Sequence, residues 1–238
     1  AQLVKINNEE SARLQDLADN LVKKSVWAIG GDGWAYDIGY GGLDHVMGSG
    51  ENINILIMDT EVYSNTGGQA SKSTPKGAVA KFAMGGKRVG KKDFGLIAMS
   101  YGNIYVCQVA WGAKDAQTLK AIREAEAYPG VSVILAYSPC IEHGIDMGKN
   151  ATNQKIMVDS GHWPLYRYDP RKSDEGKNPF QLDSKAPTDR VTMKDVFESE
   201  NRFRILMKGD PEMSQKLLDE AQNDINRKWE HLSKLSNS

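Results

Sequence analysis

The chain has 238 residues, of which 40% are hydrophobic and 26% are charged, so it is long enough and apolar enough to bury a core. Its 30 basic and 31 acidic residues give a net charge of -1, which removes any bulk electrostatic case for nucleic acid or an anionic membrane. No apolar stretch approaches the roughly 20 residues of a membrane span, no signal peptide is visible, and two cysteines make no disulfide framework. We therefore expect a cytoplasmic protein without nucleic-acid or membrane partners.

The first half of the chain alternates predicted helices and strands. Apolar residues at helical spacing predict one helix over residues 9–24 and another over residues 36–47. Short apolar runs predict strands over residues 25–30 and 53–59. Residues 60–93 follow as a long loop rich in Gly, Ser, Thr and Lys. Long loops of this kind are usually functional or disordered, and this one begins where a strand ends, so we expect it to be functional.

The second half continues the alternation. Residues 104–110 and 131–136 are predicted strands, and residues 116–128 are a predicted amphipathic helix that ends before a Pro-Gly pair. Residues 94–99 fit either a helix or a strand. Strands that alternate with helices are typical of a parallel sheet. The sequence therefore predicts an α/β fold, doubly wound, with a mainly parallel sheet and helices on both faces.

The composition changes after residue 168. Residues 169–189 are polar and contain three prolines, which indicates a loop or a surface arm. From Met213 onward, apolar residues recur at helical spacing and predict a C-terminal helix. We therefore expect residues 1–168 to form the α/β core, and residues 169–238 to add a polar arm and C-terminal helices that pack on the same domain.

Oxygen-bearing residues follow two of the predicted strands. Gly31-Asp32-Gly33 ends the first strand and Asp59-Thr60-Glu61-Val62 ends the second, with 25 residues between them. A lone Gly-Asp-Gly is most often a tight turn, but here it precedes a helix and has a second strand end at the right interval. Parallel strands would bring Asp32 and Thr60 to the edge where open α/β sheets bind ligands. Because Mg²⁺ prefers hard oxygen ligands and few carboxylates, the spacing predicts a Mg²⁺-diphosphate site.

This pattern resembles the thiamine diphosphate motif, although the usual motif ends in Asn-Asn and this chain has Asp59-Thr60. The variant resembles the 2-oxoacid:ferredoxin oxidoreductases. The strings at residues 31–42 and 59–69 are very close to the pyruvate:ferredoxin (flavodoxin) oxidoreductases, and residues 138–144 are a third match. The resemblance covers about residues 10–235. It implies the C-terminal thiamine diphosphate-binding domain of those large enzymes, with the diphosphate-binding type of that fold.

The resemblance also implies roles for individual residues. The cofactor-binding positions that it transfers to this chain are Gly31, Asp32, Gly33, Trp34, Thr60, Val62 and Asn65. Asp32 and Thr60 would bind Mg²⁺ through their side chains, and Val62 would bind it through its carbonyl oxygen. Asn65 would be a catalytic residue near the thiazolium, where an amide can donate to developing oxyanion character. The alternative for Asn65 is an Asx-turn residue in a glycine-rich loop.

The implied reaction is the oxidative decarboxylation of pyruvate with coenzyme A to acetyl-CoA and CO₂. Electrons would pass through 4Fe–4S clusters to ferredoxin or flavodoxin, and the enzyme would be a homodimer. Pyruvate is favoured over other 2-oxoacids only by the closeness of the resemblance. The carboxylate that activates the cofactor would lie in another domain of the same enzyme, because Glu61 is too close to the metal motif. Alone, the chain is expected to bind the cofactor weakly and turn over poorly.

Cys140 corresponds by resemblance to one ligand of a 4Fe–4S cluster. Such clusters need four thiolates, and this chain has only Cys140 and Cys107, of which Cys107 is expected in the core. Either the other ligands lie in polypeptide N-terminal to residue 1, which we favour, or Cys140 is a small buried residue and no cluster binds.

Two rival functions remain open at this stage. One is a non-oxidative thiamine-dependent 2-oxoacid decarboxylase subunit, which would have no use for Cys140 as a ligand. The other is a non-catalytic interaction module that keeps the fold without the cofactor. The Lys-rich stretch of residues 72–92 fits either a site for phosphorylated coenzyme A or acidic ferredoxin, or a solvated surface. The role of His143 is not decided by the sequence.

Overall fold

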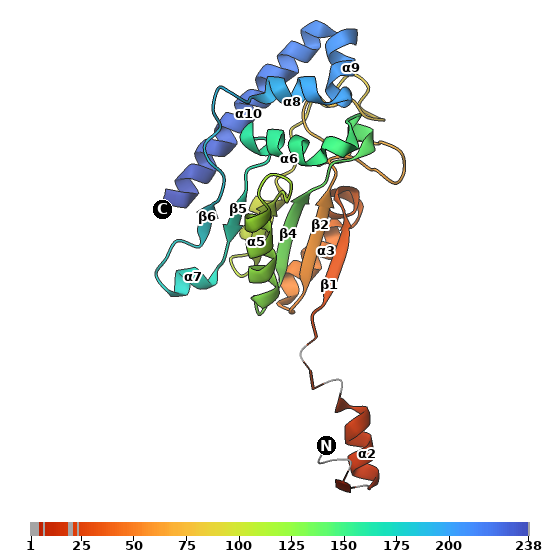
Figure 1. The fold of residues 1–238 in the computed structure, drawn as a ribbon, viewed down its shortest axis with the longest axis vertical. Helices are drawn as coiled ribbons and strands as arrows, with labels where there is room; N and C mark the ends of the chain where they lie inside the picture. Colours follow the sequence, from red (N-terminus) through yellow and green to blue (C-terminus); the bar gives the residue numbers. More distant parts are fainter. Residues whose placement is uncertain (1–4, 7, 19–20, 23, 238) are drawn as a thin grey trace.

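A six-stranded sheet in the order β1-β2-β4-β3-β5-β6 forms the centre of the molecule (Figure 1). The computed structural model describes residues 5–6, 8–18, 21–22 and 24–237. The strands are β1 (Trp27–Gly31), β2 (Asn54–Asp59), β3 (Tyr105–Val109), β4 (Ser132–Tyr137), β5 (Tyr166–Tyr168) and β6 (Phe180–Leu182). The first four pair in parallel, and β5 and β6 are antiparallel at one edge. The predicted mainly parallel α/β sheet is therefore confirmed.

Helices cover both faces of the sheet, as predicted. Successive side chains of a strand point to opposite faces. Ile55 and Ile57 of β2 therefore belong to the larger core, with α3 (Tyr40–Ser49) and α4 (Phe94–Met99). On the opposite face, Cys107 packs in a smaller cluster against α5 (Asp115–Ala127), as expected for a core cysteine.

Two helices differ in detail from the prediction. The helix expected over residues 36–47 begins earlier, because a π-helical segment η2 (Gly33–Ile38) leads into α3. At the N-terminus, Asn8 and Ser11 form a capping box that starts α2 (Glu9–Asp16), and this helix is shorter than predicted. The rest of that predicted helix includes residues 19, 20 and 23, which lie outside the described residues.

Residues 169–238 contribute elements that the sequence did not predict. Where a loop or surface arm was expected, the chain forms a short helix, α7 (Arg171–Asp174), and then β6. Arg167 of β5 holds this edge through ion pairs with Asp183 (2.8 Å) and Glu124 (2.7 Å). A polar sequence can therefore form an edge strand.

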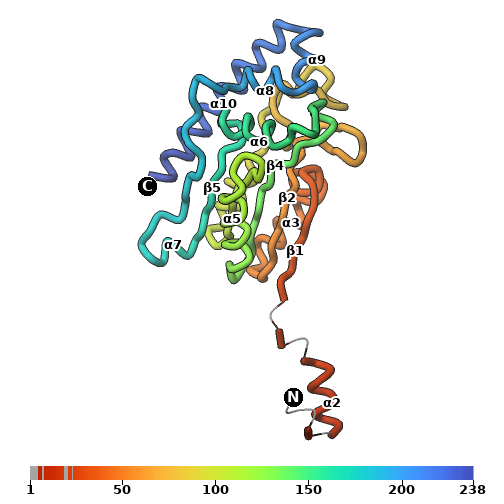
Figure 2. The backbone as a smooth tube through the Cα atoms, in the orientation of Figure 1, coloured from red at the N-terminus to blue at the C-terminus, as the bar shows by residue number. Residues whose placement is uncertain are grey.

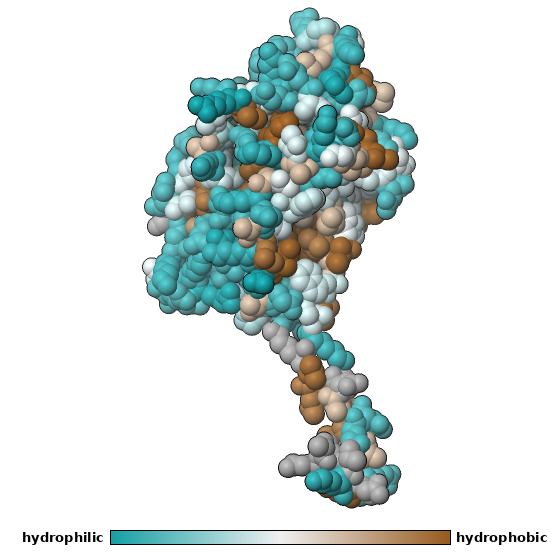
Figure 3. Space-filling model, in the orientation of Figure 1, coloured by the Kyte–Doolittle hydropathy of each residue, from teal (hydrophilic) through white to brown (hydrophobic). Residues whose placement is uncertain are grey.

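The C-terminal third continues as α8 (Met193–Ser199), α9 (Asn201–Gly209) and α10 (Pro211–Asn237). Its residues Phe197, Phe203 and Ile225 join the same core cluster as Ile55 of the central sheet. None of the described helices is both long and apolar enough to cross a bilayer. The visible face is mostly hydrophilic, with apolar side chains gathered over the front of the parallel strands (Figure 3).

The loop of residues 60–93 lies at the carboxyl end of the parallel strands (Figure 2). It contains only isolated bridges, such as those that join Gln69 to Tyr63 and Lys81. Lys87 Nζ donates to the carbonyl oxygens of Ser71 (2.8 Å) and Thr74 (2.5 Å), so this lysine is turned into the loop. The long loop is therefore a built structure beside the end of β2.

Candidate functional site

The sheet register brings the two oxygen-bearing strand ends together. Gly31 of β1 pairs with Met58 of β2, so Asp32 and Thr60 follow directly at the same edge. The Asp32 Oδ1 atom lies 2.8 Å from Thr60 Oγ1 and accepts a hydrogen bond from the Thr60 backbone N–H at 3.2 Å. The two side chains that the sequence singled out as metal ligands are thus in direct contact.

A third oxygen completes the group. The carbonyl oxygen of Val62 lies 2.9 Å from Thr60 Oγ1. Adjacent ligands of an octahedral Mg²⁺ with bonds of about 2.0–2.1 Å lie about 2.9 Å apart, so these separations fit such an ion. Within the described residues, no group of three or more His, Cys, Asp or Glu side chains is placed to hold a metal. A Mg²⁺ site with one carboxylate, a hydroxyl and a carbonyl needs no such group.

The electrostatics of Asp32 favour a cation beside it. Asp32 is 1% exposed, and Ser71 Oγ donates to its second oxygen at 2.6 Å. Burial, followed by the nearby negative charge of Asp59, raises the pKa of Asp32 to about 6, although hydrogen bonds from Ser71 and Thr60 lower it. A divalent cation at the three oxygens would offset both unfavourable effects on the carboxylate.

The glycines of the motif have different surroundings. Gly31 is exposed, and an added Cβ would meet only the Met58 carbonyl oxygen, at 3.9 Å, so its backbone is open to a ligand. Gly33 is buried, and an added Cβ would overlap the Tyr63 ring. The Trp34 ring packs in the same way against Gly30 and Gly39 on either side of it. Glycine at position 33 thus has a packing reason that the sequence did not reveal.

Replacing Gly33 with Ala should destabilise the chain by about 1–3 kcal/mol, because the new methyl group overlaps a ring that is part of the loop. Gly42, in the exposed part of α3, is the matched control, since an added Cβ there meets nothing within 4 Å. Gly42→Ala should stabilise by roughly 0.5–1 kcal/mol, as expected for a helix interior. Urea unfolding of both variants measures the free energy of unfolding, which should fall in Gly33→Ala and rise in Gly42→Ala. A Gly33→Ala variant as stable as the unsubstituted chain would contradict the packing of the Tyr63 ring on Gly33.

A buried cluster of charged and histidine side chains surrounds Glu61, the residue between Thr60 and Val62. The sequence did not predict this cluster. Its members, here called the Glu61 cluster, are Asp59, Glu61, Lys91, His143, His162, Glu200 and Arg202. The Glu61 carboxylate is fully buried and receives Lys91 (3.1 Å), His162 (2.8 Å) and Arg202 (2.7 Å). Burial alone would raise the pKa of Glu61, but these three neighbours hold it well below its ordinary value. Glu61 is therefore an ionised anchor for the loop that follows β2.

His143 contacts the backbone of Thr60, at the end of β2. Its Nε2 atom lies 2.6 Å from the Thr60 carbonyl oxygen, and because a carbonyl only accepts, Nε2 carries the hydrogen. Burial and the nearby Arg202 charge lower the pKa of His143 to about 3, so the ring is neutral. The sequence did not assign a role to His143; in the structure, its side chain hydrogen-bonds to the Thr60 backbone.

Cys140 contacts Ser64, and Asn65 is the next residue of the chain after Ser64. Cys140 is 8% exposed, and its Sγ atom donates to Ser64 Oγ at 3.3 Å. Ser64 Oγ donates in turn to Thr60 Oγ1 at 2.8 Å, which connects Cys140 to the three oxygens. Asn65 is exposed in a turn closed by the Gly67 N–H and the Ser64 carbonyl (3.1 Å), and its side chain makes no hydrogen bond with the described residues. The structure therefore brings Cys140 to the site and leaves the Asn65 side chain in solvent.

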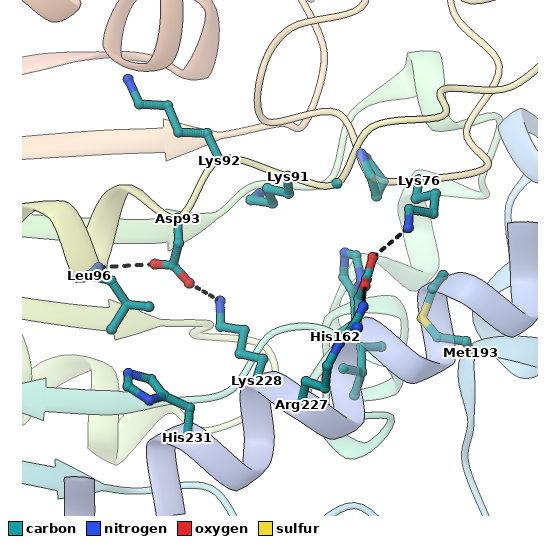
Figure 4. Close-up of a pocket in the computed structure, with 15 residues that line it drawn as sticks. Lys76, Lys91, Lys92, Asp93, Leu96, His162, Met193, Arg227, Lys228 and His231 are labelled. Atoms are coloured by element: carbon teal, nitrogen blue, oxygen red, sulfur yellow. Dashed lines mark hydrogen bonds and ion pairs between the residues drawn. The ribbon is translucent and has the colours of Figure 1, made fainter.

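Three lysines of the loop, Lys76, Lys91 and Lys92, line a cavity of about 580 Å³ between the loop, α4 and α10 (Figure 4). Lys228 pairs with Asp93 at 2.8 Å, and Lys76 pairs with Asp224 at 2.8 Å. Lys91, also on this lining, belongs to the Glu61 cluster. Lys76 and Lys91 are therefore paired with carboxylates, whereas the Lys72 side chain is 64% exposed, so the basic-surface interpretation stays a prediction.

Comparisons with known proteins identify the family of this chain. Residues 12–136 match the family described as the C-terminal TPP binding domain of thiamine pyrophosphate enzymes. Pyruvate-flavodoxin oxidoreductase of Trichormus variabilis is 61% identical over 94% of this chain and 19% of its own length. Pyruvate:ferredoxin oxidoreductase of Moorella thermoacetica is 56% identical over 92% of this chain and 18% of its own length.

The chain thus spans about a fifth of the length of these relatives. A solved structure of 2-oxoglutarate:ferredoxin oxidoreductase from Magnetococcus marinus has a TM-score of 0.45 and 20% identity, covering 77% of this chain and 67% of that one. The resemblance that the sequence motifs indicated is confirmed by the family match and the sequence relatives. This chain belongs to the family of C-terminal TPP binding domains of thiamine pyrophosphate enzymes.

Proposed function

We propose that this chain holds the Mg²⁺-diphosphate half of thiamine diphosphate within a pyruvate:ferredoxin or pyruvate:flavodoxin oxidoreductase. The observation that carries this proposal is the convergence of Asp32 Oδ1, Thr60 Oγ1 and the Val62 carbonyl oxygen at separations of 2.8 and 2.9 Å. The relatives that match nearly the whole chain carry the names of such oxidoreductases, which supports the choice of reaction.

The chain's own residues would bind and orient the cofactor. Asp32, Thr60 and Val62 would hold the metal, and the open backbone at Gly31, together with Gly33 and Trp34, would lie along the diphosphate. When bound, thiamine supplies a carbanion that attacks the 2-oxo carbon of pyruvate and an electron sink for the decarboxylation. Asn65, exposed on the loop beside the site, would donate a hydrogen bond to developing oxyanion character.

The remaining parts of the reaction would come from outside this chain. Coenzyme A would accept the acetyl group, ferredoxin or flavodoxin would accept the electrons, and other domains of a homodimeric enzyme would supply the activating carboxylate. Cys140 would be one of four thiolate ligands of a 4Fe–4S cluster, the others coming from other segments. Its contact with Ser64, which itself contacts Thr60, supports a cluster position close to the metal site.

Replacing Cys140 with Ala in the whole enzyme should lower the iron content and remove pyruvate-dependent ferredoxin reduction but keep thiamine diphosphate bound. Loss of a residue that only supports a metal ligand lowers metal affinity or activity by about 10–100-fold. Loss of a ligand itself should lower them by at least as much. Cys107→Ala is the matched control, because Cys107 is buried under α5 on the other side of the sheet. It should keep both iron and electron transfer.

Iron content and the rate of ferredoxin reduction measure the outcome. Full activity and unchanged iron in Cys140→Ala would contradict the oxidoreductase proposal and favour a non-oxidative 2-oxoacid decarboxylase. Failure of the unsubstituted enzyme to bind thiamine diphosphate with Mg²⁺ would instead favour the non-catalytic interaction module.

A further inference from the structure

Glu61 has an unusual backbone conformation between two of the three candidate metal ligands. It lies between Thr60, whose hydroxyl contacts Asp32, and Val62, whose carbonyl oxygen contacts that same hydroxyl. Its φ angle is +56°, in the left-handed region that residues with a Cβ rarely adopt. Such strain persists only where the surroundings enforce it, and it is concentrated at functional sites.

The surroundings fix every polar group of Glu61. Its backbone N–H donates to Asp59 Oδ1 at 3.0 Å, and its carbonyl oxygen accepts from Thr74 Oγ1 at 2.7 Å. Its carboxylate is held by Lys91, His162 and Arg202, as described above for the Glu61 cluster. The residue therefore cannot turn to a relaxed conformation without breaking several buried contacts at once.

The strained conformation has a direct geometric consequence. In an extended strand, side chains stand perpendicular to the sheet, whereas carbonyl groups lie within it. A side-chain oxygen at position 60 and a carbonyl oxygen at position 62 would then point in different directions. The left-handed turn at Glu61 instead brings Thr60 Oγ1 and the Val62 carbonyl oxygen to 2.9 Å.

The most distant anchor of this turn comes from the C-terminal third of the chain. Arg202 of α9 lies 141 residues after Glu61, is 4% exposed, and bridges Glu61 (2.7 Å) and Glu200 (2.6 Å). The Arg202 carbonyl oxygen also accepts from the Val79 N–H of the same loop at 2.8 Å. The C-terminal helices are thereby joined to the loop that carries two of the three oxygens.

We infer that Glu61 is a positioning residue for the metal site: clamped by Lys91, His162 and Arg202, it holds the left-handed turn that aims Thr60 Oγ1 and the Val62 carbonyl at a single divalent cation. The inference rests on the proposed Mg²⁺ site but assigns the preorganisation of its ligands to a residue that touches neither metal nor substrate. Its purely structural alternative is a cluster that stabilises the fold without affecting the metal.

The test is a Mn²⁺ titration followed by electron paramagnetic resonance, with thiamine diphosphate present and with this chain in the whole enzyme of which it is part. Glu61→Gln keeps the size of the side chain and removes its charge, and Arg202→Lys keeps the charge and removes the two-pronged bridge. Glu51→Gln is the control, because Glu51 is exposed before the opposite end of β2. Melting of each chain without metal reports stability separately.

The inference predicts Mn²⁺ affinity at least about 10-fold weaker in Glu61→Gln, a smaller loss in Arg202→Lys, and no change in Glu51→Gln. If Glu61→Gln does not fold cooperatively, Arg202→Lys decides alone. Unchanged Mn²⁺ affinity in a folded cluster variant, with only a lower melting temperature, would overturn the inference and leave the proposed function standing. No Mn²⁺ binding by the unsubstituted whole enzyme would overturn both.

Discussion

Replacing Asp32 with Asn should abolish Mg²⁺-dependent binding of thiamine diphosphate while the metal-free chain keeps or gains stability. Asp32 supplies the one carboxylate among the three converging oxygens, and a neutral amide is a much weaker ligand for Mg²⁺. We expect the affinity for the cofactor in Mg²⁺ to fall by at least about 100-fold. Even changes to residues that only support metal ligands lower metal affinity or activity by about 10–100-fold. Isothermal titration calorimetry with thiamine diphosphate, in Mg²⁺ and in EDTA, measures the loss.

The stability of the same variant should depend on pH in a definite direction. The pKa of Asp32 is raised to about 6 in the folded chain, so its ionisation costs no stability below about pH 4, and the cost grows as the pH rises to 6. At pH 7 without metal, the Asp32→Asn substitution would therefore relieve up to about 3 kcal/mol, and this advantage should vanish at pH 4.

Asp44→Asn is the control for both measurements. Asp44 is exposed on α3, accepts a hydrogen bond from Tyr101, and lies outside the group of three oxygens. The variant should bind the cofactor as the unsubstituted chain does. Undiminished Mg²⁺-dependent binding by Asp32→Asn would contradict the assignment of the metal site.

Replacing Arg202 with Met should destabilise the chain by about 3–5 kcal/mol, because it leaves the buried carboxylates of Glu61 and Glu200 without their shared cation. For a chain of this size, such a loss corresponds to a melting temperature lower by about 6–20 °C. Differential scanning calorimetry on the metal-free chain gives the value.

Arg204→Met is the matched control for this change. Arg204 lies on the same helix, two residues later, and its side chain is exposed. A surface substitution of this kind should change stability by no more than about 0.5 kcal/mol. Equal melting temperatures for the two variants would show that Arg202 does not hold the Glu61 cluster.

The sequence predicted the parts of the molecule whose signals are local. Strand ends at Gly31 and Asp59 could be recognised because an apolar run stops there, and the parallel sheet then placed Asp32 beside Thr60. The core position of Cys107 followed in the same way from its place inside an apolar strand. Periodicity and motif spacing were therefore enough to predict the fold and where in it the candidate site lies.

Features that depend on distant residues could not be predicted. No local pattern joins Glu61 to Arg202, which is 141 residues away, and a Glu between two ligands looks only like a polar loop residue. The packing of Tyr63 on Gly33 depends on how the loop folds back over η2. The edge strand β6 was missed because a three-residue strand in a polar, Pro-containing stretch has no detectable alternation.

The structure also adds residues around the candidate site that the sequence did not single out. Asn65, the residue assigned by resemblance to catalysis, is solvent-exposed on its turn, and His143 contacts the Thr60 carbonyl oxygen at the strand end beside the Glu61 cluster. The loop that appeared Lys-rich in sequence uses Lys76, Lys87 and Lys91 for internal contacts. Buried charges therefore hold the loop beside the candidate site.

The most direct test of the account is anomalous diffraction at the manganese edge from crystals grown with Mn²⁺ and thiamine diphosphate. The account predicts one strong peak bonded to Asp32 Oδ1, Thr60 Oγ1 and the Val62 carbonyl oxygen, with the cofactor's diphosphate completing the coordination. A thiamine diphosphate complex in which the metal lies elsewhere, or in which these three oxygens bind no metal, would contradict it.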